Sequence, residues 1–159
     1  MSKEAMLKQY AMTRGYLLKV LENVTEETAD VRPEGFNNTV RWNAGHILET
    51  AEEFFFGFPK TSHIPVEYKK IFGNGTKPAD WQAKPPSLAT LRTQLHDQVA
   101  RIQETMEGRL GQPLPKPFSL GPGLDFATYD DVLLFALTHE AMHLGYINAM
   151  KRAIGGGAK

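Results

Sequence analysis

Residues 88–110, LATLRTQLHDQVARIQETMEGRL, carry the pattern that decides the fold. Apolar residues recur in this stretch every three or four positions over about five turns, which places them on one face of an α-helix. They are Leu88, Leu91, Leu95, Val99, Ile102 and Met106. Ser87 can cap the first turn, and Gly111 is expected to end the helix. The stretch therefore predicts an amphipathic helix with one face in a core.

Two stretches in the N-terminal third show the same helical period. Residues 2–24 begin with Ser2 as a cap. Residues 39–58 follow a cap at Asn38 or Thr39, whose side chains can accept hydrogen bonds from the free amides of a first turn. Both stretches are predicted to be helices.

A fourth helix is predicted over residues 129–154. Thr128 and Asp131 have the spacing of a capping box, in which each side chain bonds the other residue's backbone amide. In the second helix, Gly45 weakens the helix but is expected to allow close backbone packing.

Two long connections separate these helices. Residues 60–86 include HIPVEYKKIFG, which could form a short helix, and then several glycines and prolines. Residues 111–127 are rich in Gly and Pro and predict a loop with at most short extended pieces. No stretch alternates apolar and polar residues well enough to predict a core strand. We therefore predict an all-α single domain over residues 1–159, a four-helix bundle whose long crossover lets the second and third helices run parallel.

The composition is that of an ordinary globular domain. The chain has 159 residues, 42% of them hydrophobic and 23% charged, which argues against disorder. Lys and Arg (18) balance Asp and Glu (18), so the basic excess typical of nucleic-acid or anionic-membrane binders is missing. The sequence contains no cysteine, which excludes disulfides, thiolate metal sites and cysteine nucleophiles.

Neither a leader nor a membrane span is predicted. The first ten residues, MSKEAMLKQY, scatter charges and lack the apolar region of a secretory signal. No run approaches the roughly 18 apolar residues of a spanning helix. We expect a cytoplasmic protein that binds neither membranes nor nucleic acids.

His139 and His143 are four residues apart in the last predicted helix. Four residues turn a helix by about 400°, so both imidazoles project from nearly the same face. The side chains around that direction are mostly apolar: Val132, Phe135, Ala136, Met142, Tyr146 and Met150. Two buried imidazoles need partners, which a metal ion would supply. Alternatively, the pair is hydrogen-bonded or lies at the surface without a metal.

The same five residues spell H-E-x-x-H, which in zinc proteases places two ligands and a general base on one helix. Such a site needs a third ligand, usually downstream. Residues 144–159 contain no His, Asp or Glu, and no strand edge for a peptide substrate is predicted. A metallohydrolase of this type is therefore the least favoured interpretation.

The third ligand is expected upstream, and His46 is the best candidate. It lies one turn into the second helix, at the border of the apolar face, although alone it would be interpreted as a surface histidine. His63 lies in a loop beside prolines, and His96 has polar neighbours and should face solvent. His46, His139 and His143 would provide three imidazole ligands and an open position, which suits Zn²⁺ or Ni²⁺ and less well Fe²⁺.

Two stretches, RWNAGHILE (41–49) and THEAMHLGYI (138–147), resemble the two signatures of the DinB-like superfamily. This group includes the YfiT-type metal-dependent hydrolases and the bacillithiol S-transferases. Its pattern has a His after a Trp in the second helix and a late H-x-x-x-H followed by Gly. The matching residues here are Trp42, His46, His139, His143 and Gly145. The order of helices and the long crossover agree as well, so the resemblance spans nearly the whole chain.

The resemblance implies a metal held by the three histidines, in a bundle that often pairs into homodimers. Characterised relatives activate a low-molecular-weight thiol and transfer it to an electrophile. The resemblance therefore implies a metal-dependent thiol S-transferase or a related detoxifying enzyme, with a small-molecule thiol or electrophile as substrate. The alternative is a non-catalytic metal-binding protein of a stress response. One departure is Tyr146, where the family often has Gln, which changes what lines the open side of the site.

Three further residues are candidates for the site. Glu49 follows His46 by three residues and could orient a ligand or take the fourth position. Glu140 is rotated about 100° from its neighbour His139, towards a second layer or solvent. Tyr146 could donate a hydrogen bond at the mouth of the site or pack in the core. The aromatic cluster near the end of the second helix predicts core or a dimer interface; its members are Phe54, Phe55, Phe56 and Phe58.

Overall fold

Four long helices make up most of the described residues, which confirms the helical part of the all-α prediction. The computed structural model describes residues 2–57 and 60–155. In chain order its elements are α1 (Lys3–Leu21), α2 (Glu26–Ala29), α3 (Val40–Phe56), α4 (Tyr68–Phe72), the 3₁₀ helix η1 (Pro78–Asp80), α5 (Leu88–Glu107), β1 (Pro113–Ser119), β2 (Asp125–Thr128) and α6 (Tyr129–Ile154).

Each long helix begins at a side-chain cap. Ser2, Thr39, Ser87 and Thr128 each accept a hydrogen bond from the amide three residues further on. At α6 the carboxylate of Asp131 also accepts from the amide of Thr128, at 2.8 Å, which completes the predicted capping box. A cap of this kind contributes about 1 kcal/mol. Helix α5 ends at Glu107 with Gly108 at its C-cap, so it is shorter than the predicted 88–110.

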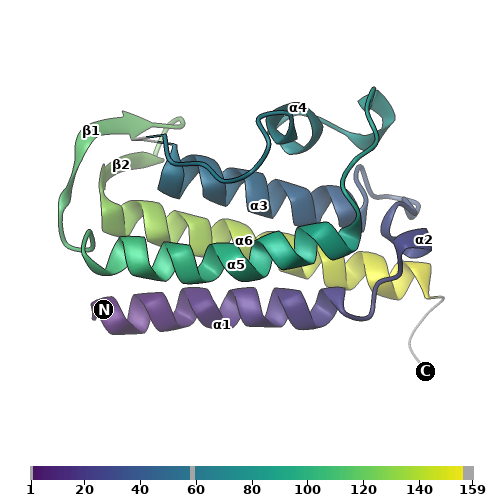
Figure 1. The fold of residues 1–159 in the computed structure, drawn as a ribbon, viewed down its shortest axis with the longest axis horizontal. Helices are drawn as coiled ribbons and strands as arrows, with labels where there is room; N and C mark the ends of the chain where they lie inside the picture. Colours follow the sequence, from purple (N-terminus) through teal and green to yellow (C-terminus); the bar gives the residue numbers. More distant parts are fainter. Residues whose placement is uncertain (1, 58–59, 156–159) are drawn as a thin grey trace.

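The long helices contact one another in pairs. Helix α1 packs against α5 and α6, and α3 packs against the same two helices. Helices α3 and α5 run in one direction, and α1 and α6 run in the other (Figure 1). The connection between α3 and α5 must therefore return along the molecule. It carries α4, which packs on α3.

Helix α3 is buried along most of its 17 residues. At Gly45 a Cβ atom would lie 2.4 Å from the ring of Phe72 on α4, so only glycine allows this contact. Gly45 therefore allows a close approach, as predicted, but by a side chain rather than by a backbone. Phe72 is fully buried, which contributes about 1.5–3 kcal/mol, and its position brings the backbone of α4 close to the middle of α3.

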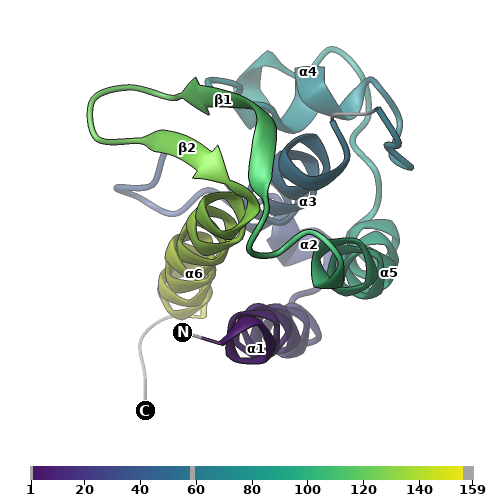
Figure 2. The ribbon, with the colours of Figure 1, turned by 90° about the vertical axis from the view of Figure 1, so that its left-hand side faces the viewer.

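A β-hairpin departs from the all-α prediction. Strands β1 and β2 are antiparallel, with Phe118 opposite Phe126 and an irregular register towards Pro113. The prolines of β1 argued against a strand, because proline cannot donate to a ladder. In a two-stranded sheet, however, every strand is an edge strand, where proline is tolerated. The hairpin lies over the N-terminal end of α6 and beside α3 (Figure 2).

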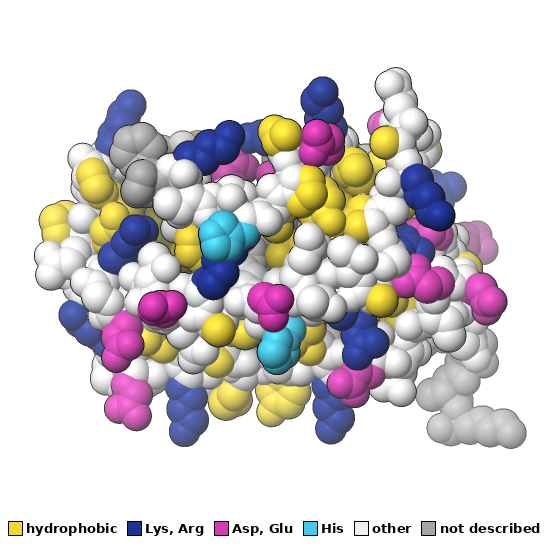
Figure 3. All heavy atoms as spheres, in the orientation of Figure 1, with side chains coloured by type: hydrophobic (Ala, Val, Ile, Leu, Met, Phe, Trp, Pro, Cys, Tyr) yellow, Lys and Arg dark blue, Asp and Glu magenta, His cyan; other side chains and the backbone are white. Residues whose placement is uncertain are grey.

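The surface mixes charges of both signs. Basic and acidic side chains are interspersed on the face drawn in Figure 3. That face therefore has no continuous basic stripe of the kind that follows a phosphate backbone. None of the helices in the described parts of the chain is both long enough and apolar enough to cross a membrane.

Candidate metal centre

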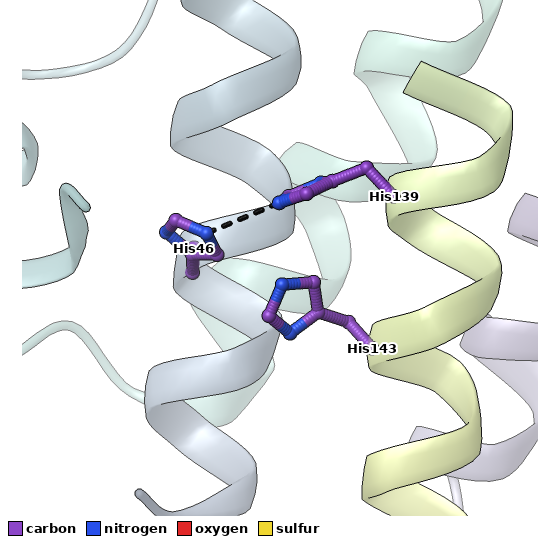
Figure 4. A group of neighbouring side chains, drawn as sticks. All are labelled: His46, His139 and His143. Atoms are coloured by element: carbon purple, nitrogen blue, oxygen red, sulfur yellow. Dashed lines mark hydrogen bonds between the residues drawn. The ribbon is translucent and has the colours of Figure 1, made fainter. Parts of the chain in front are cut away.

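Three histidines from two helices converge between α3 and α6. His46 on α3 faces His139 and His143, which lie one turn apart on α6 (Figure 4). One nitrogen from each ring lies within 4.8 Å of the others. The Nε2 atoms of His46 and His139 are 3.2 Å apart. Two nitrogen ligands of one tetrahedral Zn²⁺ lie about 3.3 Å apart, given Zn–N bonds of about 2.0–2.1 Å. The group could therefore hold a metal ion.

His46 is held in one orientation by α4. Its Nδ1–H donates to the carbonyl oxygen of Phe72 at 2.6 Å, because a carbonyl oxygen can only accept. The ring of Trp42 stacks on the imidazole, with 4.5 Å between the centroids. The carbonyl is within reach because Gly45 lets Phe72 sit against α3. The Nε2 lone pair of His46 is thus directed towards the other histidines.

His143 is fixed through the side-chain amide of Asn43. The amide nitrogen of Asn43 donates to the carbonyl oxygen of Thr39 at 2.8 Å. This leaves the Oδ1 atom to accept the Nδ1–H of His143 at 2.7 Å. Metal-binding histidines usually donate their second N–H to an oxygen in this way, which fixes the tautomer and makes Nε2 the free ligand atom. Helix α3 therefore contributes both His46 and the support of His143.

Burial keeps all three imidazoles neutral. It lowers the pKa of His139 to about 4, and the nearby His46 adds to the effect. Burial, His139 and His46 together lower the pKa of His143 to about 3. Burial also lowers the pKa of His46, against the opposing effect of the Phe72 carbonyl. Near neutral pH the rings are therefore in the form that binds metal ions.

The donor set fits a divalent ion of intermediate softness. Neutral imidazoles are common ligands of Zn²⁺ and Ni²⁺ and also bind Fe²⁺. An ion would satisfy the converging lone pairs, including those of His46 and His139, which face each other. The residues present thus fit a bound metal of this class.

A cavity of about 720 Å³ opens beside the three-His group. His46 and His139 lie in its wall, and two rows of side chains lead from them towards the hairpin. The row on α3 is Glu49, Thr50, Glu53 and Phe54, and the row on α6 is Phe135, Val132 and Tyr129. The volume is in the range of small-molecule pockets, about 300–1,000 Å³. A small molecule can therefore reach two of the three histidines.

Glu140 faces away from the histidines, into the contact between α1 and α6. Its carboxylate oxygens accept from Nε and Nη2 of Arg14 at 2.6 and 2.8 Å. Arg14 also donates to the carbonyl oxygen of Leu95 and to Gln98. Arg14 and Glu140 are both buried, so the expectation of a solvated Glu140 is wrong. The ion pair also occupies the carboxylate that an H-E-x-x-H protease would use as general base.

Glu49 lies in the cavity wall, one turn after His46. Its carboxylate is not part of the group of ligand atoms that lie within 4.8 Å of one another. Burial, with a contribution from Glu53, raises the pKa of Glu49 to about 6, against the opposing effect of Lys69. This carboxyl can therefore gain or lose a proton near neutral pH beside the three-His group.

Tyr146 lies outside the site. Its side chain is 60% exposed, so it is not core. The ring contacts Phe36 edge-on, with centroids 6.3 Å apart. Tyr146 is also not among the residues that line the cavity.

The remaining sequence candidates divide between surface and core. His63 and His96 are exposed, and His96 contacts Asp97. Phe55 and Phe56 are core residues. Phe54 contacts aromatic rings of the hairpin and α6, namely Phe118, Phe126 and Phe135. Phe58, the fourth member of the predicted cluster, lies outside the described residues.

Sequence reasoning missed the residues that hold the histidines and Glu140 in place. Asn43 was detectable, because it is a polar residue one turn before His46 in a helix with an apolar face. Arg14 was detectable in a similar way, since it lies between Tyr10 and Leu17 on the buried stripe of α1. Phe72 contributes only a backbone carbonyl, which no side-chain pattern reveals.

Known proteins share this architecture. A family model described as the DinB superfamily matches residues 9–147, a range that contains all three histidines. The fold also matches the crystal structure of a conserved protein from Enterococcus faecalis, with a TM-score of 0.70 and 15% identity. That match covers 98% of this chain and 99% of the other. No curated protein matches the sequence. On the extent of the family match, the chain belongs to the DinB superfamily.

Proposed function

We propose that this protein is a metal-dependent thiol S-transferase, or a related detoxifying enzyme, with its ion held by His46, His139 and His143. A divalent ion keeps its positive charge among neutral imidazoles and lowers the pKa of a thiol or water bound to it. The observation that carries the proposal is the position of the three-His group at the wall of a cavity of about 720 Å³. A small thiol and a small electrophile can both approach from this side.

The cavity wall supplies what the transfer needs besides the ion. Phe54, Val132 and Phe135 make the wall apolar, which limits water around the sulfur and strengthens charge interactions. Glu49 can accept the thiol proton, because its pKa is about 6. During transfer the sulfur–carbon bond forms as the bond from that carbon to its leaving group breaks.

Metal analysis combined with a conjugation assay tests this function. Protein loaded with Zn²⁺ or Ni²⁺ is incubated with a panel of low-molecular-weight thiols and monochlorobimane, in which sulfur displaces chloride. We expect about one ion per chain, because the described residues contain a single three-His group, together with conjugation of at least one thiol. His139→Ala should abolish both. His96→Ala removes an exposed imidazole outside the site and should change neither. A wild-type protein that binds no metal would refute the proposal.

The alternative is a non-catalytic metal-binding protein, and one observation favours it. Glu140, the carboxylate next to His139 in sequence, is occupied by Arg14 and is not available for proton transfer. The same experiment separates the two functions, because bound metal without conjugation of any thiol supports the alternative. Peptide cleavage that Glu140→Gln abolishes would support a metallohydrolase, and the buried ion pair argues against that result.

The proposal extends to the assembly. We propose that residues 1–159 form one domain, a four-helix bundle of α1, α3, α5 and α6 that works in the cytoplasm as a homodimer. Exposed apolar side chains on α1 and α6 support such an interface; they include Tyr16, Met142 and Tyr146. Light scattering is expected to give twice the chain mass of 17.8 kDa. A single-chain mass would contradict the dimer.

A further inference from the structure

Opposite charges mark the two ends of the cavity beside the three-His group. At the histidine end, the carboxylate of Glu49 lies in the wall and forms no hydrogen bond in the described part of the chain. At the hairpin end, Arg109 and Lys116 line the same cavity. Between them, Glu53 is bound by Lys69 at 2.6 Å. Without a bound metal ion, the uncompensated side-chain charge is therefore negative near the histidines and positive near the hairpin.

Arg109 is a half-buried cation that has no acidic partner among the described residues. Its guanidinium lies over the ring of Tyr129, 5.4 Å from the centroid. Within residues 2–57 and 60–155, no carboxylate lies within ion-pair distance of it. Asp130, next to Tyr129, instead accepts from the amide of Gly111 at 2.7 Å. The planar fork of N–H groups on Arg109 is thus available to an anion that enters the cavity.

The two ends lie about 15 Å apart. Tyr129 beneath Arg109 and His139 beside the cavity are ten residues apart on α6, and a helix rises about 1.5 Å per residue. The wall between them is apolar, with contributions from α3, α6 and β1; it includes Phe54, Leu114, Phe118, Val132 and Phe135. A molecule that spans the cavity therefore needs a long apolar body.

We propose that the cavity binds an elongated carboxylic acid whose carboxylate contacts Arg109, with Lys116 near the entrance. The apolar body would lie between α3, α6 and the hairpin, and the far end would reach the three-His group. In the metal-free protein the reverse orientation is disfavoured, because it would place the acid next to the carboxylate of Glu49. This inference rests on the proposed function, since it names the substrate class of the same site, but the binding itself needs no metal.

Calorimetry with a matched pair of probes tests the inference on protein freed of metal by a chelator. The probes are 8-phenyloctanoate and its uncharged amide, which share one apolar body. We expect the acid to bind about tenfold more tightly, as one charge-assisted hydrogen-bonded contact at a partly exposed site allows. Arg109→Met should abolish this preference and leave the affinity for the amide unchanged. Arg152→Met removes an exposed arginine of α6 outside the cavity and should keep the preference.

Three results would overturn the inference: equal binding of acid and amide by the wild type, no binding of either probe, or a preference that survives Arg109→Met. A melting curve shows whether that variant is folded. If it is not, Arg109→Lys, which keeps the charge but loses the planar fork, should reduce the preference to about threefold. An unchanged preference in Arg109→Lys then counts against the inference.

His139→Ala distinguishes this inference from the proposed function. That variant should lose the metal and still prefer the acid. A wild type that prefers the acid but binds no metal would refute the proposed function and leave the acid site in place.

Discussion

Helix α6 carries polar residues on two faces, and the two faces are satisfied in different ways. On the α1 side, Glu140 forms two hydrogen bonds with Arg14 and is closed off from solvent. On the α3 side, His139 and His143 direct ring nitrogens towards His46. On the first face, protein groups alone satisfy the carboxylate. The second brings together lone pairs that a cation would satisfy.

Polar residues that are adjacent in sequence therefore have different surroundings. His139 and Glu140 belong to one H-E-x-x-H motif, yet about 100° of helical rotation sends them to different neighbours. The H-E-x-x-H motif therefore does not by itself show that its residues form one site. Three substitutions, from the largest expected effect to the smallest, test the contacts on these two faces and at the cavity beside the histidines.

Loss of Arg14 should have the largest effect, because it breaks the structural face. Arg14→Met leaves the charge of Glu140 buried without a partner, so the free energy of unfolding should fall by about 3–5 kcal/mol. The double variant Arg14→Met/Glu140→Met removes both charges and should recover most of this loss. Urea denaturation measures both effects. A single variant as stable as the wild type would show that the ion pair does not matter for stability.

Asn43→Ala should lower the affinity for a metal ion and leave the contact between Arg14 and Glu140 intact. His143 loses the acceptor of its Nδ1–H, so the affinity for Zn²⁺ should fall by about 10- to 100-fold. Competition with a chromophoric chelator measures this affinity. Asn23→Ala is the matched control. Like Asn43, Asn23 donates to the carbonyl oxygen four residues earlier, but it is exposed just after α1 and contacts no histidine. Unchanged affinity in Asn43→Ala, or an equal loss in both variants, would contradict the assigned role.

Glu49→Gln should produce the smallest effect, and one that depends on pH. Burial raises the pKa of Glu49 in the folded protein to about 6 from 4.5, so the folded state binds more protons than the unfolded state between these values. The wild type should therefore lose up to about 2 kcal/mol of stability as the pH rises from about 4.5 to 6. The variant lacks this loss and should be the more stable protein at pH 7.

Denaturation of metal-free protein at pH 4 and pH 7 checks this prediction. Glu104→Gln makes the same chemical change at an exposed position of α5 and should show no comparable gain at pH 7. The prediction is wrong if, at both pH 4 and pH 7, the free energies of unfolding of the two variants differ from that of the wild type by the same amount.

The helices and the spacing of His139 and His143 could be predicted from the sequence. Caps act within three residues, as at Thr128 and Asp131, and an apolar stripe repeats every turn. His46 was predicted as the third ligand because it was the best-placed remaining histidine, and the structure brings it to the other two. Metal binding itself, and the identity of the ion, stay predictions.

The hairpin and the partner of Glu140 could not be predicted in this way. The proline-containing strand β1 depends on its pairing with β2 and on aromatic contacts with Phe54, which are not local. Glu140 was expected in a second layer or in solvent because nothing near it in sequence reveals Arg14, 126 residues earlier. Long-range pairs of this kind follow from how helices pack.

The sequence by itself therefore determined the helices and the histidine pair, because helix starts, helix periods and this pair depend on residues within about one turn of each other. The chemistry of the site depended on packing. Asn43, the Phe72 carbonyl and Gly45 orient two imidazoles only because α4 and α6 rest against α3. The cavity likewise exists only where α3, α6 and the hairpin meet, and its charged residues Glu49, Arg109 and Lys116 come from different segments of the chain.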